Sequence, residues 1–74
     1  MSETKNERFI RIAEARTNKI INMINLLSNC SNKNNYEYTD EDVKKIFLAI
    51  ETELKIAKHK FENAGIEKKE FKLR

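Results

Sequence analysis

The sequence predicts an all-α fold, in which an antiparallel hairpin of two long helices pairs with a second copy into a four-helix bundle. From Val43 to Ala64, apolar residues recur at alternating spacings of four and three, which places them along one face of an α-helix. The first half of the chain carries a broader apolar face, and an asparagine-rich stretch separates the two halves. The only glycine, Gly65, directly follows the second apolar face, where a helix commonly ends.

The first helix is expected at about residues 7–29. Its apolar arc is centred on Phe9, Ile20 and Leu27 and is wider than the roughly 100° that packing against one neighbour requires. This helix is therefore expected to contact two other helices, which a second copy of the hairpin would supply. On its exposed side, Glu7 is expected to pair with Arg11 one turn later. The aliphatic residues available for a second interface are Ile10, Ile12, Ile21, Ile24 and Ile46.

The connection is expected at residues 30–38, which show no periodic apolar pattern and are rich in side chains that hydrogen-bond their own backbone in turns. Thr39 is the expected N-cap of the second helix, with Asp42 in the reciprocal position of a capping box. Tyr38 is placed to pack on Val43, the contact known as a hydrophobic staple. These signals predict that the second helix begins at residue 40.

The second helix is expected at about residues 40–64. Gly65 is expected to end it in the left-handed conformation, while Ile66 packs back on Phe61. The charged segment that follows, residues 66–74, is too short to form a stable helix alone and is expected to be a tail.

Two helices of about equal length make one domain over residues 1–65, in which an antiparallel arrangement aligns Leu27 with Val43 and Phe9 with Phe61. A chain of 74 residues buries too little surface to be stable easily, and its single cysteine cannot form an internal disulfide. Self-association is the remaining means of stabilisation, so we expect a homodimer. The apolar seam of the hairpin and dimer is expected to consist of Phe9, Ile20, Leu27, Val43, Phe47, Ile50, Leu54 and Phe61.

Arg16 is a charged residue near the middle of the first helix's apolar arc. A charge there is costly unless it is paired, and the hairpin alignment places Arg16 opposite Leu54, with Glu53 as the nearest carboxylate. The simpler interpretation is a side chain whose stem lies on the seam while its guanidinium reaches that carboxylate. The alternative is a specificity contact within the dimer or with a ligand.

The composition predicts a cytoplasmic protein that does not contact the membrane. No apolar run approaches the roughly 18 residues of a membrane span, and the N-terminus lacks the apolar stretch of a secretion signal. One histidine and one cysteine cannot assemble a tetrahedral metal site, and no nucleophile, base and orienting group come together. We therefore expect no enzyme, no catalytic or metal-binding residues and no cofactor, and we expect Cys30 to be a free thiol in the turn.

One side of the first helix carries amides and cations at helical spacing, and it is the candidate nucleic-acid face. Such side chains can hydrogen-bond phosphates, sugars and base edges. The alternative is an ordinary solvated helix face. The residues of this amide stripe are Arg11, Asn18, Lys19, Asn22, Asn25 and Asn29.

Leu48 and Ile56 lie eight residues apart on the outer side of the second helix, near His59. They form a candidate patch for an unidentified protein partner. The alternative is a pair of scattered exposed aliphatics, which are ordinary on protein surfaces. His59 alone, without an acid or nucleophile beside it, does not make an active site.

Three segments, 6–9, 13–19 and 35–43, resemble a group of short uncharacterised helical proteins of low-GC Gram-positive bacteria and their mobile elements. The resemblance covers about residues 6–61 and implies an accessory or regulatory role on such an element. The expected function is a non-enzymatic, self-associating helical interaction or regulatory module. The alternatives are a hairpin that binds RNA or DNA through the amide stripe, and a protein-binding inhibitor or adaptor.

Overall fold

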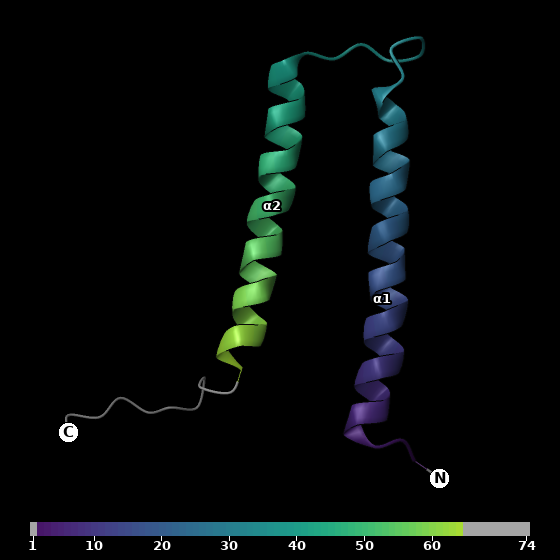
Figure 1. The fold of residues 1–74 in the computed structure, drawn as a ribbon, viewed down its shortest axis with the longest axis vertical. Helices are drawn as coiled ribbons and strands as arrows, with labels where there is room; N and C mark the ends of the chain where they lie inside the picture. Colours follow the sequence, from purple (N-terminus) through teal and green to yellow (C-terminus); the bar gives the residue numbers. More distant parts are fainter. Residues whose placement is uncertain (1, 65–74) are drawn as a thin grey trace, which may run out of the picture. The chain divides into compact units, whose positions relative to one another are not determined.

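The computed structural model describes residues 2–64, and within them every regular element is helical (Figure 1). Helix α1 spans Lys5–Ser28, the short 3-10 helix η1 spans Asn29–Ser31, and helix α2 spans Asp40–Asn63. The chain divides into two units, Met1–Glu37 with α1 and Tyr38–Arg74 with α2. The predicted all-α class is confirmed for the described residues.

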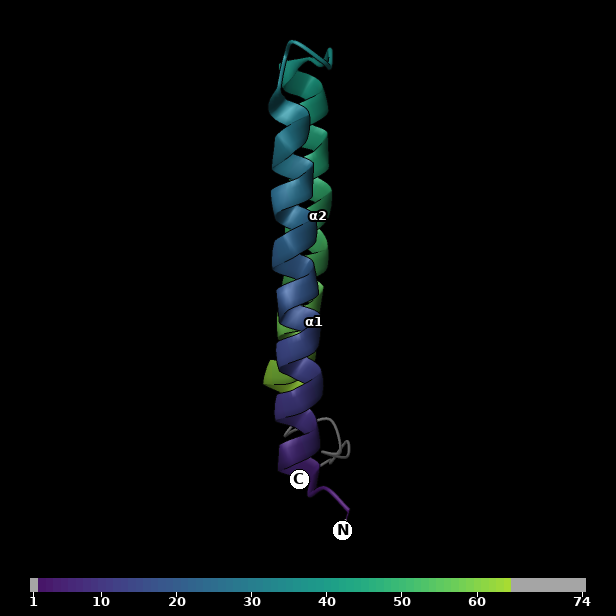
Figure 2. The ribbon, with the colours of Figure 1, turned by 90° about the vertical axis from the view of Figure 1, so that its right-hand side faces the viewer.

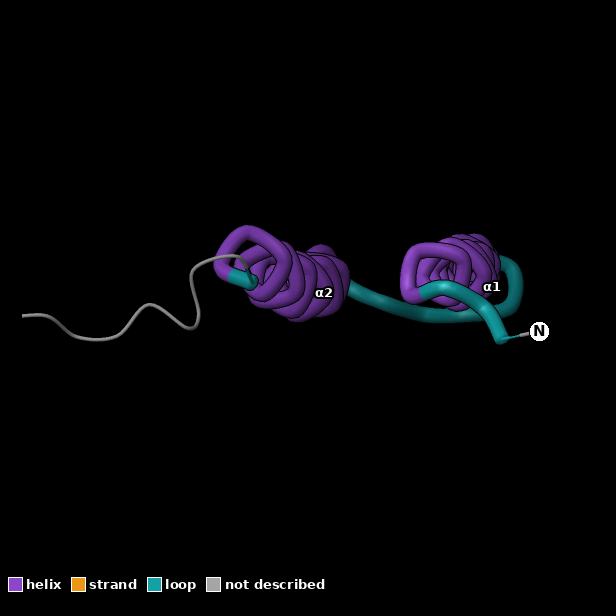
Figure 3. The backbone as a smooth tube through the Cα atoms, turned by 90° about the horizontal axis from the view of Figure 1, so that it is seen from below, coloured by secondary structure: helices purple, strands orange, loops and turns teal. Residues whose placement is uncertain are grey.

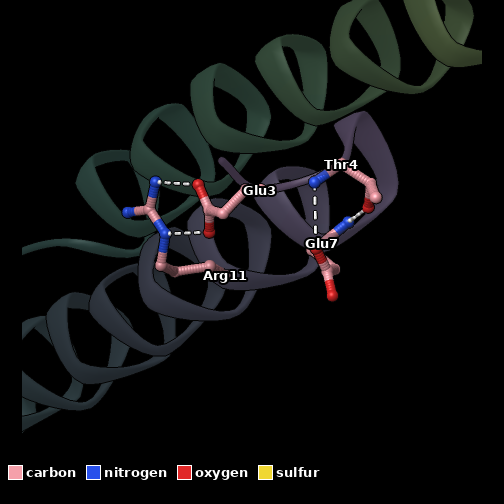
Figure 4. Close-up of polar contacts among 4 residues, drawn as sticks. All are labelled: Glu3, Thr4, Glu7 and Arg11. Carbon is pink, nitrogen blue, oxygen red and sulfur yellow. Dashed lines mark hydrogen bonds and ion pairs between the residues drawn. The ribbon is translucent and has the colours of Figure 1, made fainter. Parts of the chain in front are cut away.

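Helix α1 begins two residues earlier than predicted because Thr4 caps it. The backbone of Thr4 is extended, with φ −73° and ψ 165°, and its hydroxyl oxygen accepts the Glu7 N–H at 3.0 Å. The Glu7 carboxylate in turn accepts the Thr4 N–H at 2.9 Å (Figure 4). Two of the N–H groups that lack a partner inside the helix are thereby satisfied.

One side chain, that of Ser28, hydrogen-bonds the backbone at the C-terminal end of α1. The Ser28 hydroxyl lies 3.1 Å from the Ile24 carbonyl and 3.0 Å from the Asn25 carbonyl, and it can donate to either of them. The chain then tightens into η1, and the Asn32 side chain accepts the Asn34 N–H at 3.0 Å. The Asn32 carbonyl also accepts the Tyr36 N–H at 3.0 Å. The asparagine-rich stretch therefore forms a hydrogen-bonded turn, drawn as a tube in Figure 3.

Helix α2 begins where the sequence predicts. The Thr39 hydroxyl oxygen accepts the Asp42 N–H at 3.1 Å, and the Asp42 carboxylate accepts the Thr39 N–H at 2.9 Å. Asp40, Glu41 and Asp42 place three carboxylates in the first turn, where they interact favourably with the helix dipole. Tyr38 and Val43, the two residues of the predicted staple, are both half-buried.

Helix α2 ends at Asn63, and Ala64 follows it with right-handed helical dihedrals. The predicted left-handed stop at Gly65, the contact of Ile66 with Phe61 and the tail at 66–74 lie outside the described residues. Each helix has 24 residues. Both ribbons run without a break (Figure 2).

None of residues 2–64 is buried. A helix with one apolar side normally buries that side against another element. Within each unit of this chain, the apolar side is open to solvent. These exposed apolar surfaces are the candidate binding surfaces of the chain.

Candidate interaction surfaces

The first surface is the apolar side of α2, here called the α2 face. Its residues are exposed to different degrees: Ile50 is 36% exposed, Leu54 59% and Phe61 70%. From residue 43 to residue 61 the face extends about 27 Å along the helix, at 1.5 Å per residue. Its width fits contact with one neighbouring helix. The face consists of Val43, Phe47, Ile50, Leu54 and Phe61.

The second surface, the α1 face, is the centre of the apolar side of α1 and consists of Phe9, Ile20 and Leu27. Ile20 is 59% exposed, and Leu27 is half-buried. Beside it runs a second α1 strip of Ile10, Ile21 and Ile24, each about half exposed. The strip lies about 100° around the helix from the α1 face, at 100° per residue. Helix α1 therefore presents two adjoining apolar surfaces, whereas α2 presents one.

Arg11 forms an ion pair that differs from the predicted pair with Glu7. Its Nε–H donates to Glu3 Oε2 at 2.7 Å, and its Nη2 donates to Glu3 Oε1 at 2.9 Å (Figure 4). This hydrogen bonding lowers the pKa of Glu3 and raises the pKa of Arg11. The expected Glu7–Arg11 pair is wrong: Glu3, not Glu7, holds the Arg11 guanidinium at both points.

Acid is expected to weaken the N-terminal end of α1. Because the pKa of Glu3 is lowered, its pairing with Arg11 contributes fully above the ordinary glutamate pKa and is lost as the pH falls through the lowered value. In an NMR titration, Arg11→Gln should move the pKa of Glu3 upward, toward its ordinary value. Arg8→Gln, which removes a neighbouring guanidinium, should leave it in place. An unchanged Glu3 titration in Arg11→Gln would contradict this assignment.

Every residue of the amide stripe is exposed, but carboxylates lie beside the N-terminal part of the stripe. Arg11 already holds Glu3 in a two-point ion pair. A shallow depression on the same side of the helix is lined by Arg11 and Asn18 together with the carboxylates of Glu7 and Glu14. Carboxylates beside the candidate phosphate contacts repel a nucleic-acid backbone. Only the C-terminal part of the stripe, Lys19, Asn22, Asn25 and Asn29, lacks this opposition.

The candidate patch on α2 is small and divided. Leu48 is 66% exposed and Ile56 46% exposed, and Thr52 lies between them, donating its hydroxyl to the Leu48 carbonyl at 2.7 Å. On the same side, His59 Nδ1 lies 3.6 Å from Glu62 Oε1, an exposed pair three residues apart. Two aliphatic side chains separated by polar groups offer a partner little continuous apolar area.

Cys30 lies in η1 with its side chain exposed. Within residues 2–64, no three His, Cys, Asp or Glu side chains gather closely enough to hold a metal ion. No helix in this part of the chain combines the length and apolarity needed to cross a membrane.

Comparisons of the chain with protein-family models, curated proteins and solved structures give no match. Sequence reasoning missed two residues of the α1 terminus, Glu3 and Thr4. The segment Thr4-Lys5-Asn6-Glu7 has the spacing of a capping box, the signal that identified the start of α2. This segment precedes Phe9, the first residue of the apolar pattern. The predicted start of the helix was placed near Phe9 and was therefore too late.

Proposed function

We propose that this chain is a non-enzymatic interaction and regulatory module whose active form is a homodimer. In this proposal, α1 and α2 fold into an antiparallel hairpin, and two hairpins form a four-helix bundle. The observation that carries the proposal is that both helices are long and capped, yet none of residues 2–64 is buried. Burying one exposed Leu or Ile side chain stabilises a protein by about 1.5–3 kcal/mol. Covering the α1 and α2 faces is therefore the main stabilisation available to the chain.

The two apolar surfaces of α1 support the homodimer. One α2 face has the width for a single neighbour, so within one chain it can cover one of the two α1 surfaces. The other surface, the second α1 strip, remains for another copy of the hairpin. The resemblance to short proteins of mobile elements supports an accessory or regulatory role for this dimer.

A nucleic-acid-binding hairpin is the less favoured alternative. Fifteen basic and twelve acidic side chains leave a net charge of only +3. The Glu3–Arg11 pair and the carboxylates of Glu7 and Glu14 also weaken the basic side of α1. An adaptor that binds another protein through Leu48 and Ile56 is likewise less favoured, because that patch is interrupted by polar groups.

Light scattering over a dilution series, combined with a salt titration against random RNA and DNA, tests the proposal. We expect twice the mass of one chain at high protein concentration, and a thermal unfolding midpoint that falls on dilution. We also expect no nucleic-acid affinity that declines steeply with salt. A single-chain mass at every concentration would contradict the homodimer. Strong, salt-dependent binding would favour the amide stripe as the functional surface.

A further inference from the structure

The apolar sides of α1 and α2 share one repeat. In α2, seam positions follow one another at spacings of four and three, and in α1 the same spacings recur, with one charged residue, Arg16, among them. A regular alternation of four and three is the seven-residue repeat of coiled-coil packing. The α1 seam consists of the six residues at these positions: Phe9, Ala13, Arg16, Ile20, Met23 and Leu27. The α2 positions are Val43, Phe47, Ile50, Leu54, Ala57 and Phe61.

We infer that the α1 seam is covered by α2 of the same chain, running antiparallel in a single register set by Arg16 and Lys19 against Glu51 and Glu53. This inference rests on the proposed hairpin and specifies its partner surfaces. Charge complementarity carries it, since the apolar spacing alone permits several pairings. In the inferred register, Leu27 lies opposite Val43, Arg16 opposite Leu54 and Phe9 opposite Phe61.

The flanking charges of α2 select the position opposite Arg16. For Leu54, and for Phe47 and Phe61 one repeat away from it, the residues three before and one before lie on the two flanks of the seam. For Leu54 these flanking residues are Glu51 and Glu53, both acidic and exposed. The inferred register places Arg16 opposite Leu54. An arginine on an apolar seam needs a carboxylate partner, and this layer offers two.

A shift of the register by one repeat removes these partners. The residues that flank Phe47 are Lys44 and Ile46, and those that flank Phe61 are Lys58 and Lys60. Opposite either phenylalanine, Arg16 would meet cations or an aliphatic residue instead of carboxylates. The charges therefore specify one register among those that the apolar spacing allows.

Lys19 selects the direction of α2. In the inferred antiparallel register, Lys19 and Glu53 flank the seam on the same side, as the outer positions of an antiparallel coiled coil do. If α2 ran parallel to α1, Lys19 would instead lie beside Lys58, and Glu53 beside Ile24. Opposite charges across a helix pair favour the antiparallel direction, whereas like charges disfavour the parallel one.

Pairing of like helices is less favourable in most arrangements. Two antiparallel α1 helices would bring Lys19 against Lys19 of the other copy, and two antiparallel α2 helices would bring Glu53 against Glu53. Two parallel α1 helices would place Arg16 against Arg16. Only parallel α2 helices escape repulsion, by placing Glu53 near Lys58, and that pairing does not involve Lys19. A test through Lys19 therefore separates it from the inferred one.

A charge swap provides that test. Lys19→Glu and Glu53→Lys should each lower the melting temperature by roughly 4–8 °C, because each replaces an attraction by a repulsion. The double variant Lys19→Glu/Glu53→Lys should recover most of this loss. The matched control is Lys45→Glu/Glu53→Lys, which has the same net charge but reverses a lysine on the outer side of α2. It should recover nothing.

Light scattering on the same samples distinguishes failure of the register from failure of the dimer. If the swap recovers no more stability than the control, or neither single variant is destabilised, the register is overturned even where the dimer persists. If the swap recovers stability while the wild-type mass is that of one chain, the register stands and the homodimer fails. Pairing within one chain predicts recovery in the double variant and none in mixtures of the two single variants. Recovery in such mixtures, as well as in the double variant, would overturn pairing within one chain.

Discussion

Leu54→Ala is expected to lower the free energy of unfolding by about 2–5 kcal/mol, the cost of truncating a leucine that is buried in an assembled core. Leu54 is 59% exposed within its own unit, so the size of the effect depends on its being covered by another helix. Small domains have total stabilities of about 5–15 kcal/mol, and this chain is short. The variant should therefore unfold at a low denaturant concentration. Circular dichroism, which reports the helix content, measures this unfolding.

Leu48→Ala is the matched control. It makes the same chemical change outside the α2 face, about 120° around the helix from Leu54, at a residue that is 66% exposed. Substitutions at solvated positions usually change stability by less than about 0.5 kcal/mol, and alanine is the best helix former. Equal losses for the two variants would show that the α2 face is no better covered than the outer side. A large loss for Leu48→Ala alone would instead identify the Leu48 and Ile56 patch as the principal contact surface.

Arg16→Met is expected to raise the melting temperature. Replacing buried ionic groups by apolar residues of similar volume has been neutral or stabilising by about 1–4 kcal/mol in other proteins, because the charges no longer have to be removed from water. In the inferred register, Arg16 serves to specify the layer opposite Leu54 rather than to stabilise it. The variant should thus be more stable but less selective, with additional masses visible in sedimentation.

Retention of every binding activity and of a single mass by Arg16→Met would contradict the specificity role. A lower melting temperature would indicate that the guanidinium makes contacts that methionine cannot replace. Arg16→Lys separates the two effects, since lysine keeps the charge but loses the planar fork that binds a carboxylate at two points. Lysine should therefore preserve the register at lower stability than methionine.

The local structure of α2 was predictable because its signals are short-range. Thr39 and Asp42 are three residues apart, and their hydrogen bonds depend only on the backbone between them. The same physics operates at Thr4 and Glu7, and the prediction missed it only by starting the helix near the first apolar residue. The starts of both helices are thus determined by residues that lie three positions apart in the sequence.

The ion pair of Glu3 with Arg11 was not predictable in the same way. The two residues are eight apart, and they meet because the extended Thr4 backbone turns Glu3 back along the first turns of α1. A pair of this kind depends on the path of the chain before the helix, whereas the i to i+4 rule applies only within it. The pair also affects the candidate nucleic-acid face, because it engages Arg11, the cation at the N-terminal end of the amide stripe.

Apolar spacing identifies the α1 and α2 faces but does not determine what covers them. Ile20 and Ile50 are exposed within their units, and periodicity alone is compatible with pairing in either direction. The distinguishing information lies in a few charges beside the seams. Such charges contribute little energy individually, so their role is to select among arrangements that the apolar residues stabilise.

The most direct test of the proposed hairpin is the distance between the outer sides of α1 and α2 within one chain. Nitroxide labels at Asn22→Cys and Leu48→Cys, in a Cys30→Ser background, leave both apolar faces intact. Dilution with unlabelled protein restricts the pulsed electron paramagnetic resonance signal to pairs within one chain. Helices packed 8–10 Å apart predict one narrow distribution near roughly 20 Å plus the label linkers. A broad distribution at longer distances, in a protein with the mass of a single chain, would contradict both the hairpin and the homodimer.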